Sequence, residues 1–206
     1  MLKIQRKKLT NLKKNKIMKN ELIEIIKNEA ATFKIESAAI AAFIAVESSG
    51  EGFDHATGKI IIQFEPVWFK KQAPYAPSGV WSSNKVDVQI QEWKAFNDAF
   101  SKNKEAAMLS TSIGLGQIMG FHYKRLGYRS VGEMWDDAKK GIERQVWQIC
   151  KFISTDIKLS SAVKAHDWDT VATLYNGAGY KELARKYKRV PYNESMAEAY
   201  QLHKKM

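Results

Sequence analysis

The feature that most constrains this chain is an apolar run at residues 38–46, AAIAAFIAV, which ends on Glu47 and is followed by two serines and a glycine. A helix that is apolar on nearly every side must be enclosed by other elements, so we expect a central helix over residues 36–48. Helical spacing places Glu47 on the same stripe as Ile40 and Phe43. Because burying a charge is costly, this carboxylate is either a tolerated helix end or a working acid.

Helical periodicity also dominates the rest of the chain, and it predicts an α+β domain that is predominantly α-helical. One segment differs: residues 49–65 hold three glycines and then KIIIQFE, which predicts a small β-hairpin turning near residues 56–58. Ser130 and Glu133 have the spacing of a capping box at a helix start. Further helices are expected at residues 20–34, 66–72, 85–102, 104–110, 121–127, 130–138, 139–158 and 168–176, and again toward the C-terminus.

Positive charge is concentrated at the N-terminus. The net charge is +11, but residues 1–20 hold Arg6, seven lysines and no acid, which leaves +3 for the other 186 residues. We therefore predict a basic arm over residues 1–19, disordered and solvated, and one globular domain over residues 20–206. Such an arm favours anionic partners such as a cell envelope, and nothing else in the sequence indicates a specific nucleic-acid site.

Several classes of protein are disfavoured by composition. The longest apolar run is too short for a membrane span, and the basic N-terminus lacks the apolar region of a secretory signal. Cys150 is the only cysteine and has helical apolar neighbours, so we expect a buried structural thiol. The four histidines lack the spacing of a zinc site, so we expect no metal and no cofactor.

Glu47 and Glu65 form an asymmetric pair of carboxylates. Glycoside hydrolysis uses such a pair, with one protonated carboxyl that donates to the leaving oxygen and one ionised carboxylate. Apolar neighbours and a helix C-terminus disfavour the charged form of Glu47, so we expect its pKa to be raised. Glu65 shares a strand face with Gln63, and we expect it to remain ionised. Asp54 is a second candidate for the ionised group, or else a residue of the turn.

Two further segments complete an ordered set of motifs. The chain contains AVESSGEGF, FEPVWF, SIGLGQIMGF, AHDW and YNGAGY in that order. This set resembles the N-acetylmuramidase domain of phage endolysins, within the lysozyme-like superfamily that includes goose-type lysozymes and soluble lytic transglycosylases. The resemblance covers roughly residues 30–200. It implies a lysozyme-like fold with a sugar-binding cleft beside the hairpin, and cleavage of the β-1,4 bond of bacterial peptidoglycan after N-acetylmuramic acid.

The resemblance also implies roles for individual residues. Glu47 matches the catalytic acid, and Glu65 matches the acidic residue of the hairpin. Two positions, Ser112 and Gln117, match residues that line the cleft. The pair Tyr175 and Asn176 matches a Tyr-Asn pair packed beside the catalytic glutamate, where a tyrosine hydroxyl can hold the acid.

Other interpretations remain at this stage. A lytic transglycosylase would give anhydro-muramic products, but Gly114 follows Glu47 by 67 residues, which disfavours that branch. A catalytically inactive peptidoglycan-binding module is the non-enzymatic alternative. Trp68, Tyr75, Trp81 and Trp168 are candidates for stacking on sugars, although such residues more often pack. We expect a monomer that causes cell lysis and stays in the host cytoplasm until release; an injected effector would look similar.

Overall fold

The computed structural model describes residues 18–74 and 88–206. The predicted basic arm therefore lies outside the described residues except for Met18, which is buried, and Lys19, and so do Tyr75 and Trp81. Within the described part, the protein is predominantly helical and contains a three-stranded antiparallel sheet. The predicted α+β class is thus confirmed. No helix of the described residues is long and apolar enough to cross a membrane.

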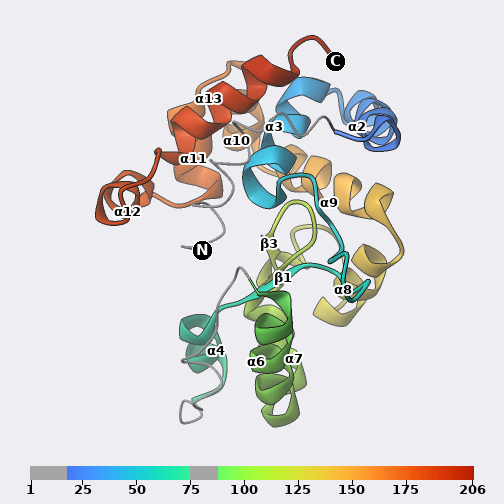
Figure 1. Ribbon diagram of the computed structural model, residues 1–206, viewed down its shortest axis with the longest axis vertical. Coiled ribbons are helices and arrows are strands. Elements are labelled where there is room, and N and C mark those ends of the chain that lie inside the picture. The colour runs from blue at the N-terminus through green and yellow to red at the C-terminus, as the bar shows by residue number, and fades with distance from the viewer. Residues whose placement is uncertain (1–17, 75–87) are drawn as a thin grey trace.

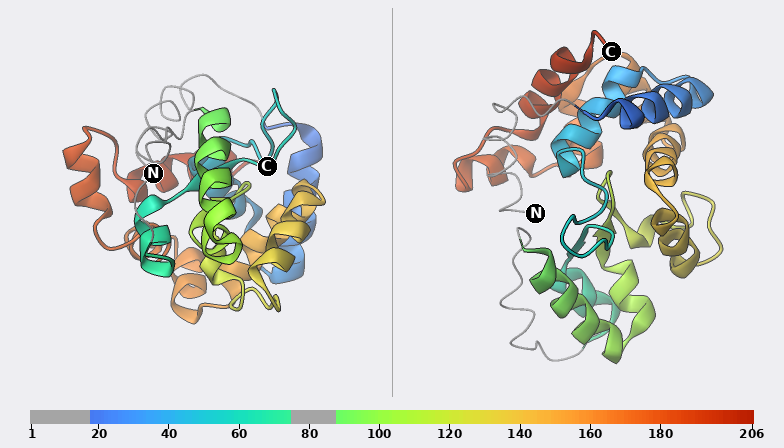
Figure 2. Two further views of the ribbon diagram at one scale, coloured as in Figure 1. Left: turned by 90° about the horizontal axis from the view of Figure 1, so that it is seen from below. Right: turned by 45° about the vertical axis from the view of Figure 1, so that its right-hand side comes forward.

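The helices fall into two groups along the long axis of the molecule (Figure 1). The first group comprises α2 (Asn20–Phe33), α3 (Ser37–Ser48), α9 (Ile142–Ser154), α10 (Ile157–Lys164), α11 (Trp168–Tyr175), α12 (Tyr180–Lys186) and α13 (Tyr192–His203). At the other end lie α4 (Pro66–Gln72), α6 (Gln89–Lys102) and α7 (Lys104–Leu109). The sheet lies between the two groups, with η1 (Gly120–His122) and α8 (Val131–Lys139), as the right-hand view of Figure 2 also shows.

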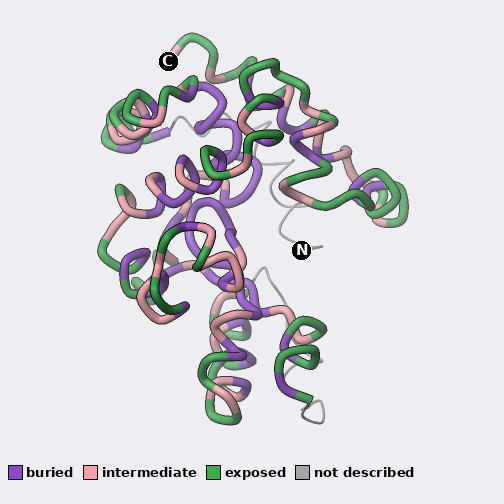
Figure 3. Tube along the Cα trace, turned by 180° about the vertical axis from the view of Figure 1, so that it is seen from behind, coloured by how far each residue is buried: buried purple, intermediate pink, exposed green. Residues whose placement is uncertain are grey.

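Helix α3 is the buried centre of the first group, as its sequence predicts. Every residue from 38 to 48 is buried, and α2, α9 and α13 all pack against this helix. Its alanines leave little side chain on several faces, so the neighbouring helices can approach closely. Figure 3 shows the same distribution: buried positions run through the middle of the molecule, and exposed positions lie on the outer turns of the helices.

The sheet corrects part of the hairpin prediction. Residues 53–60 do turn back on themselves, but only one bridge, between Phe53 and Ile60, joins the two sides among the described residues. Strand β1 (Ile62–Phe64) instead pairs with the distant β2 (Thr111–Ile113), and β2 pairs with β3 (Ile118–Met119). A strand pairs with whichever edge buries its side chains, so a partner about 50 residues away can displace the local one.

Two predicted helices are also corrected. Residues 121–127 form one 3-10 turn and further turns rather than a helix, ending at Gly127 in the left-handed region. The predicted long helix at 139–158 is two helices. Helix α9 ends at Ser154, and Asp156 then accepts a hydrogen bond from the backbone of Leu159 at 3.0 Å, which caps the start of α10.

The capping box before α8 is half confirmed. The Ser130 hydroxyl accepts from the backbone N–H of Glu133 at 3.1 Å, as predicted. The Glu133 carboxylate accepts from the backbone of Arg129 at 2.8 Å, one residue earlier than a capping box requires. The helix start is therefore the one the sequence indicates, with a shifted reciprocal bond.

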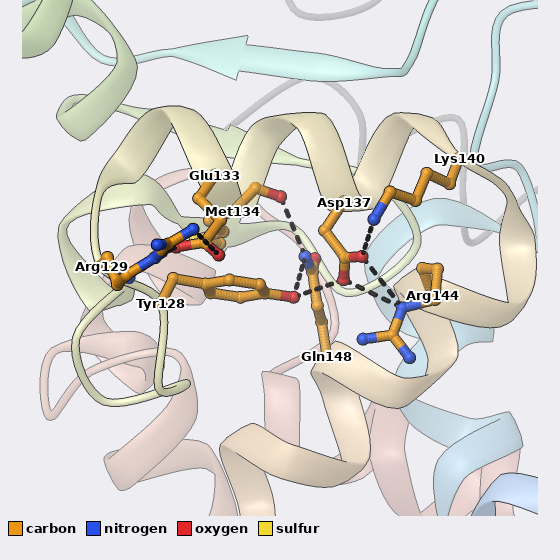
Figure 4. A network of polar contacts seen from close by, with 8 residues as sticks. All are labelled: Tyr128, Arg129, Glu133, Met134, Asp137, Lys140, Arg144 and Gln148. Atoms are coloured by element: carbon orange, nitrogen blue, oxygen red, sulfur yellow. Dashed lines mark hydrogen bonds and ion pairs between the residues drawn. The ribbon is translucent and has the colours of Figure 1, made fainter.

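A polar network joins α8 to α9 (Figure 4). The buried carboxylate of Asp137 accepts hydrogen bonds from the Tyr128 hydroxyl at 2.6 Å and from the Lys140 ammonium at 3.0 Å. Nε of Arg144 donates to both of its oxygens, at 3.0 and 3.1 Å. Gln148 donates to the Tyr128 hydroxyl at 3.0 Å and to the backbone of Met134 at 3.1 Å. These contacts fix the angle between two helices that support the sheet.

Candidate active site

Glu47 lies in the last turn of α3 and is only 5% exposed. The helix ends because Ser49 and Gly50 both take left-handed backbone angles, at φ 57° and φ 83°. The motif ESSG thus closes the helix directly after the carboxylate. A buried carboxyl here must be held by neighbouring groups, because the helix itself offers no cation in its last turn.

A tyrosine from the far end of the chain provides one such contact. The hydroxyl of Tyr192, at the start of α13, donates a hydrogen bond to Oε1 of Glu47 at 2.6 Å. Burial and the charge of Glu47 raise the pKa of Tyr192 well above its usual value, so the hydroxyl stays protonated and remains a donor. Sequence reasoning missed this residue. Pro191 signals only a helix start, and no local pattern shows where the tyrosine points.

Tyr175, the tyrosine that the motif match implicates, makes a different contact. Tyr175, at the end of α11, donates its hydroxyl hydrogen bond to the carbonyl of Gly116 at 2.7 Å. Its ring lies 4.7 Å from that of Phe43 and stacks on Tyr192 at 6.4 Å. The donor to Glu47 is therefore Tyr192, and Tyr175 packs beside it. Burial, followed by the charge of Glu47, also raises the pKa of Tyr175.

Asn176 directly follows Tyr175 and ends α11. Its backbone N–H donates to Ala172 at 2.9 Å, and the chain then turns through Gly177 at φ 105°. Asn176 is half-buried. The YNG motif is thus a helix end that fixes the tyrosine ring against Phe43.

The SIGLGQ motif forms the tight turn between β2 and β3. Gly114 has φ 65°, and a side chain at Gly116 would lie 2.6 Å from Ile149, so both positions require glycine. Ser112 donates to the side-chain oxygen of Gln117 at 3.1 Å, and the Gln117 amide donates to the Gly114 carbonyl at 2.8 Å. The two predicted cleft residues are buried and hold the turn together.

One buried glutamine on α9 anchors this turn, and it was not predicted. The side-chain oxygen of Gln145 accepts from the backbone of Leu115 at 2.9 Å, and its amide donates to the Ala138 carbonyl at 3.0 Å. The missing side chains of Gly52 and Gly114 make room for it. Gln145 therefore ties the turn to both α9 and the end of α8.

Glu65 follows β1 and caps α4. Its backbone donates to Ser110 at 2.9 Å, which continues the ladder with the segment before β2. Its side chain accepts from the amide of Gln63 at 2.5 Å, and Gln63 is paired with Ser112 in the sheet. The predicted neighbour Gln63 is thus the group that holds the Glu65 carboxylate.

Helix α6 protects the other edge of β1 with side chains. Gln89 accepts from the backbone N–H of Ile62 and donates to its carbonyl, both at 3.0 Å. The carboxylate of Glu92, fully buried, accepts from the backbone of Phe64 at 3.0 Å. These side chains pair with the backbone groups at the open edge of β1, as another strand would. They therefore fix the strand that Glu65 follows.

Contacts therefore connect five of the six predicted site residues. Glu47 is bonded to Tyr192, whose ring stacks on Tyr175. Tyr175 bonds to the glycine that precedes Gln117, and Gln117 bonds to Ser112. Ser112 is paired in the sheet with the residue that donates to Glu65. A relay of contacts thus links predicted site residues that are up to about 130 positions apart in the sequence, and Asn176 directly follows Tyr175 in the chain.

The remaining candidates have structural roles. Asp54 accepts from the backbone and hydroxyl of Thr57 at 3.0 and 2.6 Å, and so stabilises its own turn. Trp168 packs against His166 and Tyr200, which also contact each other. Cys150 is buried, as predicted, and burial raises the pKa of its thiol to about 12. Among the described residues no group of His, Cys, Asp and Glu has the arrangement of a metal site.

Of the two aromatic stacking candidates in the described residues, Trp68 is the exposed one. It lies on α4, just after Glu65, and is 39% exposed. Its ring lies 5.0 Å from Phe121, and the ammonium of Lys71 sits 4.4 Å from its centre. Phe121 is half-buried, and Trp68 follows Glu65 by three residues in the chain.

Comparison with known proteins agrees with this arrangement. Residues 36–204 match the muramidase family, described as N-acetylmuramidase. The crystal structure of the Burkholderia AP3 phage endolysin is similar, with a TM-score of 0.72 and 27% identity over 89% of this chain and 70% of that one. No curated protein matches the chain.

The family match covers most of the chain, and the endolysin structure has the same predominantly helical α+β fold, which confirms the expected fold. The enzyme class and the peptidoglycan substrate follow from the family. The chain belongs to the N-acetylmuramidase family, whose members are glycoside hydrolases of the bacterial cell wall.

Proposed function

We propose that this protein cleaves the β-1,4 bond between N-acetylmuramic acid and N-acetylglucosamine, with Glu47 as general acid and Glu65 as the second carboxylate. The observation that carries this assignment is the Tyr192 hydrogen bond to Glu47 at 2.6 Å in a buried site. A carboxyl fixed in one rotamer, away from bulk water, suits directed proton transfer.

In the proposed reaction, Glu47 gives its proton to the glycosidic oxygen as the bond from the anomeric carbon to that oxygen breaks. The positive charge that develops on the muramic ring is stabilised by ionised Glu65, which acts either as nucleophile or as the base for the attacking water. Water supplies the hydroxyl of the new reducing end, and its second proton returns to a carboxylate. The hydrogen bond from Gln63 keeps the Glu65 carboxylate oriented.

We assign the cleft wall to Ser112, Gln117, Tyr175 and Asn176. The support is the bonded turn that joins the first two and the helix end that places the last two beside Tyr192. In this arrangement these residues shape the site, and proton transfer belongs to the carboxylates. The proposed setting is lysis: the protein waits in the host cytoplasm until a membrane lesion admits it to the wall.

The test is mass spectrometry of purified peptidoglycan digested by the wild type, by Glu47→Gln and by Glu65→Gln. We expect soluble muropeptides with reducing N-acetylmuramic acid from the wild type only. Glu51→Gln is the matched control, because it makes the same change four residues after Glu47 in the chain and should keep the activity.

Other outcomes reject specific parts of the proposal. Anhydro-muramic ends would identify a lytic transglycosylase and remove the role of Glu65. Undiminished activity of Glu47→Gln would reject the assignment of Glu47 as the general acid. No soluble product from any variant, with intact binding to the wall, would leave a binding module.

A further inference from the structure

A half-buried arginine, Arg189, whose charge interacts with that of Glu47, has no role in the proposed reaction. Arg189 lies in the connection between α12 and α13, three residues before Tyr192. Its backbone donates to the Ala184 carbonyl at 3.0 Å, and Lys188 before it takes a left-handed angle, φ 49°, so the chain reverses there. The same short segment therefore positions both the tyrosine that holds Glu47 and this guanidinium.

The guanidinium has buried donors without acceptors. Nε and Nη1 of Arg189 are buried, and no group of the described residues accepts a hydrogen bond from either of them. Burial lowers the pKa of Arg189, and the nearby charges of Tyr187 and Glu47 oppose that effect. The side chain nevertheless stays charged, because guanidinium groups do not lose their proton in proteins.

Buried N–H groups without partners are costly, and proteins rarely keep them unless a ligand satisfies them. Arginine has five donors and no acceptor, so the missing partner must be an oxygen acceptor such as a carboxylate or an amide carbonyl. Two cations of the preceding helix α12 have partners: Lys181 pairs with Asp169 at 2.6 Å, and Lys186 lies over the ring of Tyr187. Within the described residues, Arg189 is the cation whose buried donors have no acceptor.

The substrate offers such an acceptor on one of its two sugars. N-acetylmuramic acid differs from N-acetylglucosamine by a lactyl ether, which ends in a carboxyl group or in the carbonyls of the attached stem peptide. Because Glu47 acts at the bond that follows the muramic residue, a cation beside Glu47 lies near that sugar. We propose that Arg189 binds the lactyl-peptide substituent and so selects muramic acid over unsubstituted N-acetylglucosamine, an inference that rests on the proposed function.

The experiment measures binding rather than turnover. Isothermal titration calorimetry compares Glu47→Gln with Glu47→Gln/Arg189→Gln. The first ligand is a tetrasaccharide of alternating N-acetylglucosamine and N-acetylmuramic acid that carries its stem peptides, and the second is tetra-N-acetylchitotetraose, which has the same length. We expect the arginine change to weaken the muramic ligand by about tenfold or more, the value of a charge-assisted hydrogen bond, and to leave the chitotetraose affinity within about twofold. The matched control is Arg185→Gln, an exposed cation four residues earlier that should change neither affinity.

Equal weakening of both ligands, or no weakening of either, would overturn the proposal. Arg189→Lys provides a second test if Arg189→Gln loses its cooperative melting transition. It keeps the charge but not the planar fork, so relative to Glu47→Gln alone it should weaken the muramic ligand by at least about threefold and leave the chitotetraose affinity within about twofold. If Glu47→Gln cleaved the muramic tetrasaccharide, the role of Glu47 as general acid would be rejected. That result would not affect the test of Arg189, because selectivity is measured as the ratio of the affinities for the two tetrasaccharides.

Discussion

At the scale of residues, two tyrosines of α13 hold the two ends of α3. Tyr192 donates to Glu47 at the C-terminal end, and Tyr200 donates to Glu36 at 2.8 Å before the N-terminal end. Both are tyrosine-to-glutamate hydrogen bonds between the same two segments. They differ in burial, because the pair at Glu47 is buried and Glu36 is exposed. The exposed contact therefore serves as a natural control for the buried one, to which the proposed function gives a catalytic role.

Replacing Tyr192 by Phe should lower kcat/KM on peptidoglycan by about tenfold or more, since one hydrogen bond to a charged or protonated carboxyl is lost while the ring remains. The measurement is the rate of release of reducing ends from purified walls. Tyr200→Phe, the matched control, should change the melting temperature slightly and leave the rate unchanged. A rate for Tyr192→Phe equal to that of the control would show that Glu47 needs no such donor.

At the scale of elements, the sheet turn and the α8–α9 network depend on single buried side chains. Gln145 bonds to both the turn at Leu115 and the end of α8 at Ala138. The same helix carries Arg144, which pairs with Asp137. Helix α9 is therefore the element to which both the β2–β3 turn and helix α8 are attached.

Substituting Gln145 by Leu should reduce the free energy of unfolding by about 2–4 kcal/mol, because a buried backbone N–H and a buried carbonyl both lose their partners. Urea denaturation followed by circular dichroism measures this loss. Gln201→Leu, at an exposed position of α13, should change stability by no more than about 0.5 kcal/mol. A loss for Gln145→Leu as small as that would mean that water replaces both bonds.

Asp137 predicts how stability depends on pH. Burial alone would raise its pKa, but the hydrogen bonds from Tyr128, Lys140 and Arg144 outweigh burial and hold the pKa below 3.8. The unfolded chain therefore binds this proton at higher pH than the folded protein does. The contribution to stability is complete above about pH 4 and is lost as the pH falls through the lowered pKa.

We expect Asp137→Asn to destabilise the protein by about 1–3 kcal/mol at neutral pH and to flatten the decline of melting temperature below pH 4. Calorimetry from pH 2.5 to 7 checks both effects. Asp136→Asn removes an exposed carboxylate that pairs with Lys139 at 3.2 Å, and it should leave the curve close to that of the wild type. If the two variants gave the same curve, the network would contribute no net stability.

At the scale of the whole molecule, the charge of the N-terminal arm predicts salt-dependent binding to the wall. Residues 1–17 hold Arg6, six lysines and no acid, and they lie outside the described residues. Deleting them should weaken binding to purified cell walls at low salt, and the difference should shrink as salt screens the charges. Co-sedimentation at about 20 and 200 mM salt measures this. Equal binding of both forms at low salt would show that the arm does not contribute.

The sequence by itself determined the helical class, the buried helix that ends on Glu47, the glycine turn of SIGLGQ and the Tyr-Asn helix end. It could do so because apolar periodicity, caps and glycines act over a few neighbouring residues. Only the tertiary structure decided which distant groups meet: β1 pairs with β2, Gln89 and Glu92 cover the strand edge, and Tyr192 reaches Glu47. Such contacts depend on how helices pack across more than a hundred residues, and no local pattern encodes the direction in which a single tyrosine or arginine points once the chain has closed.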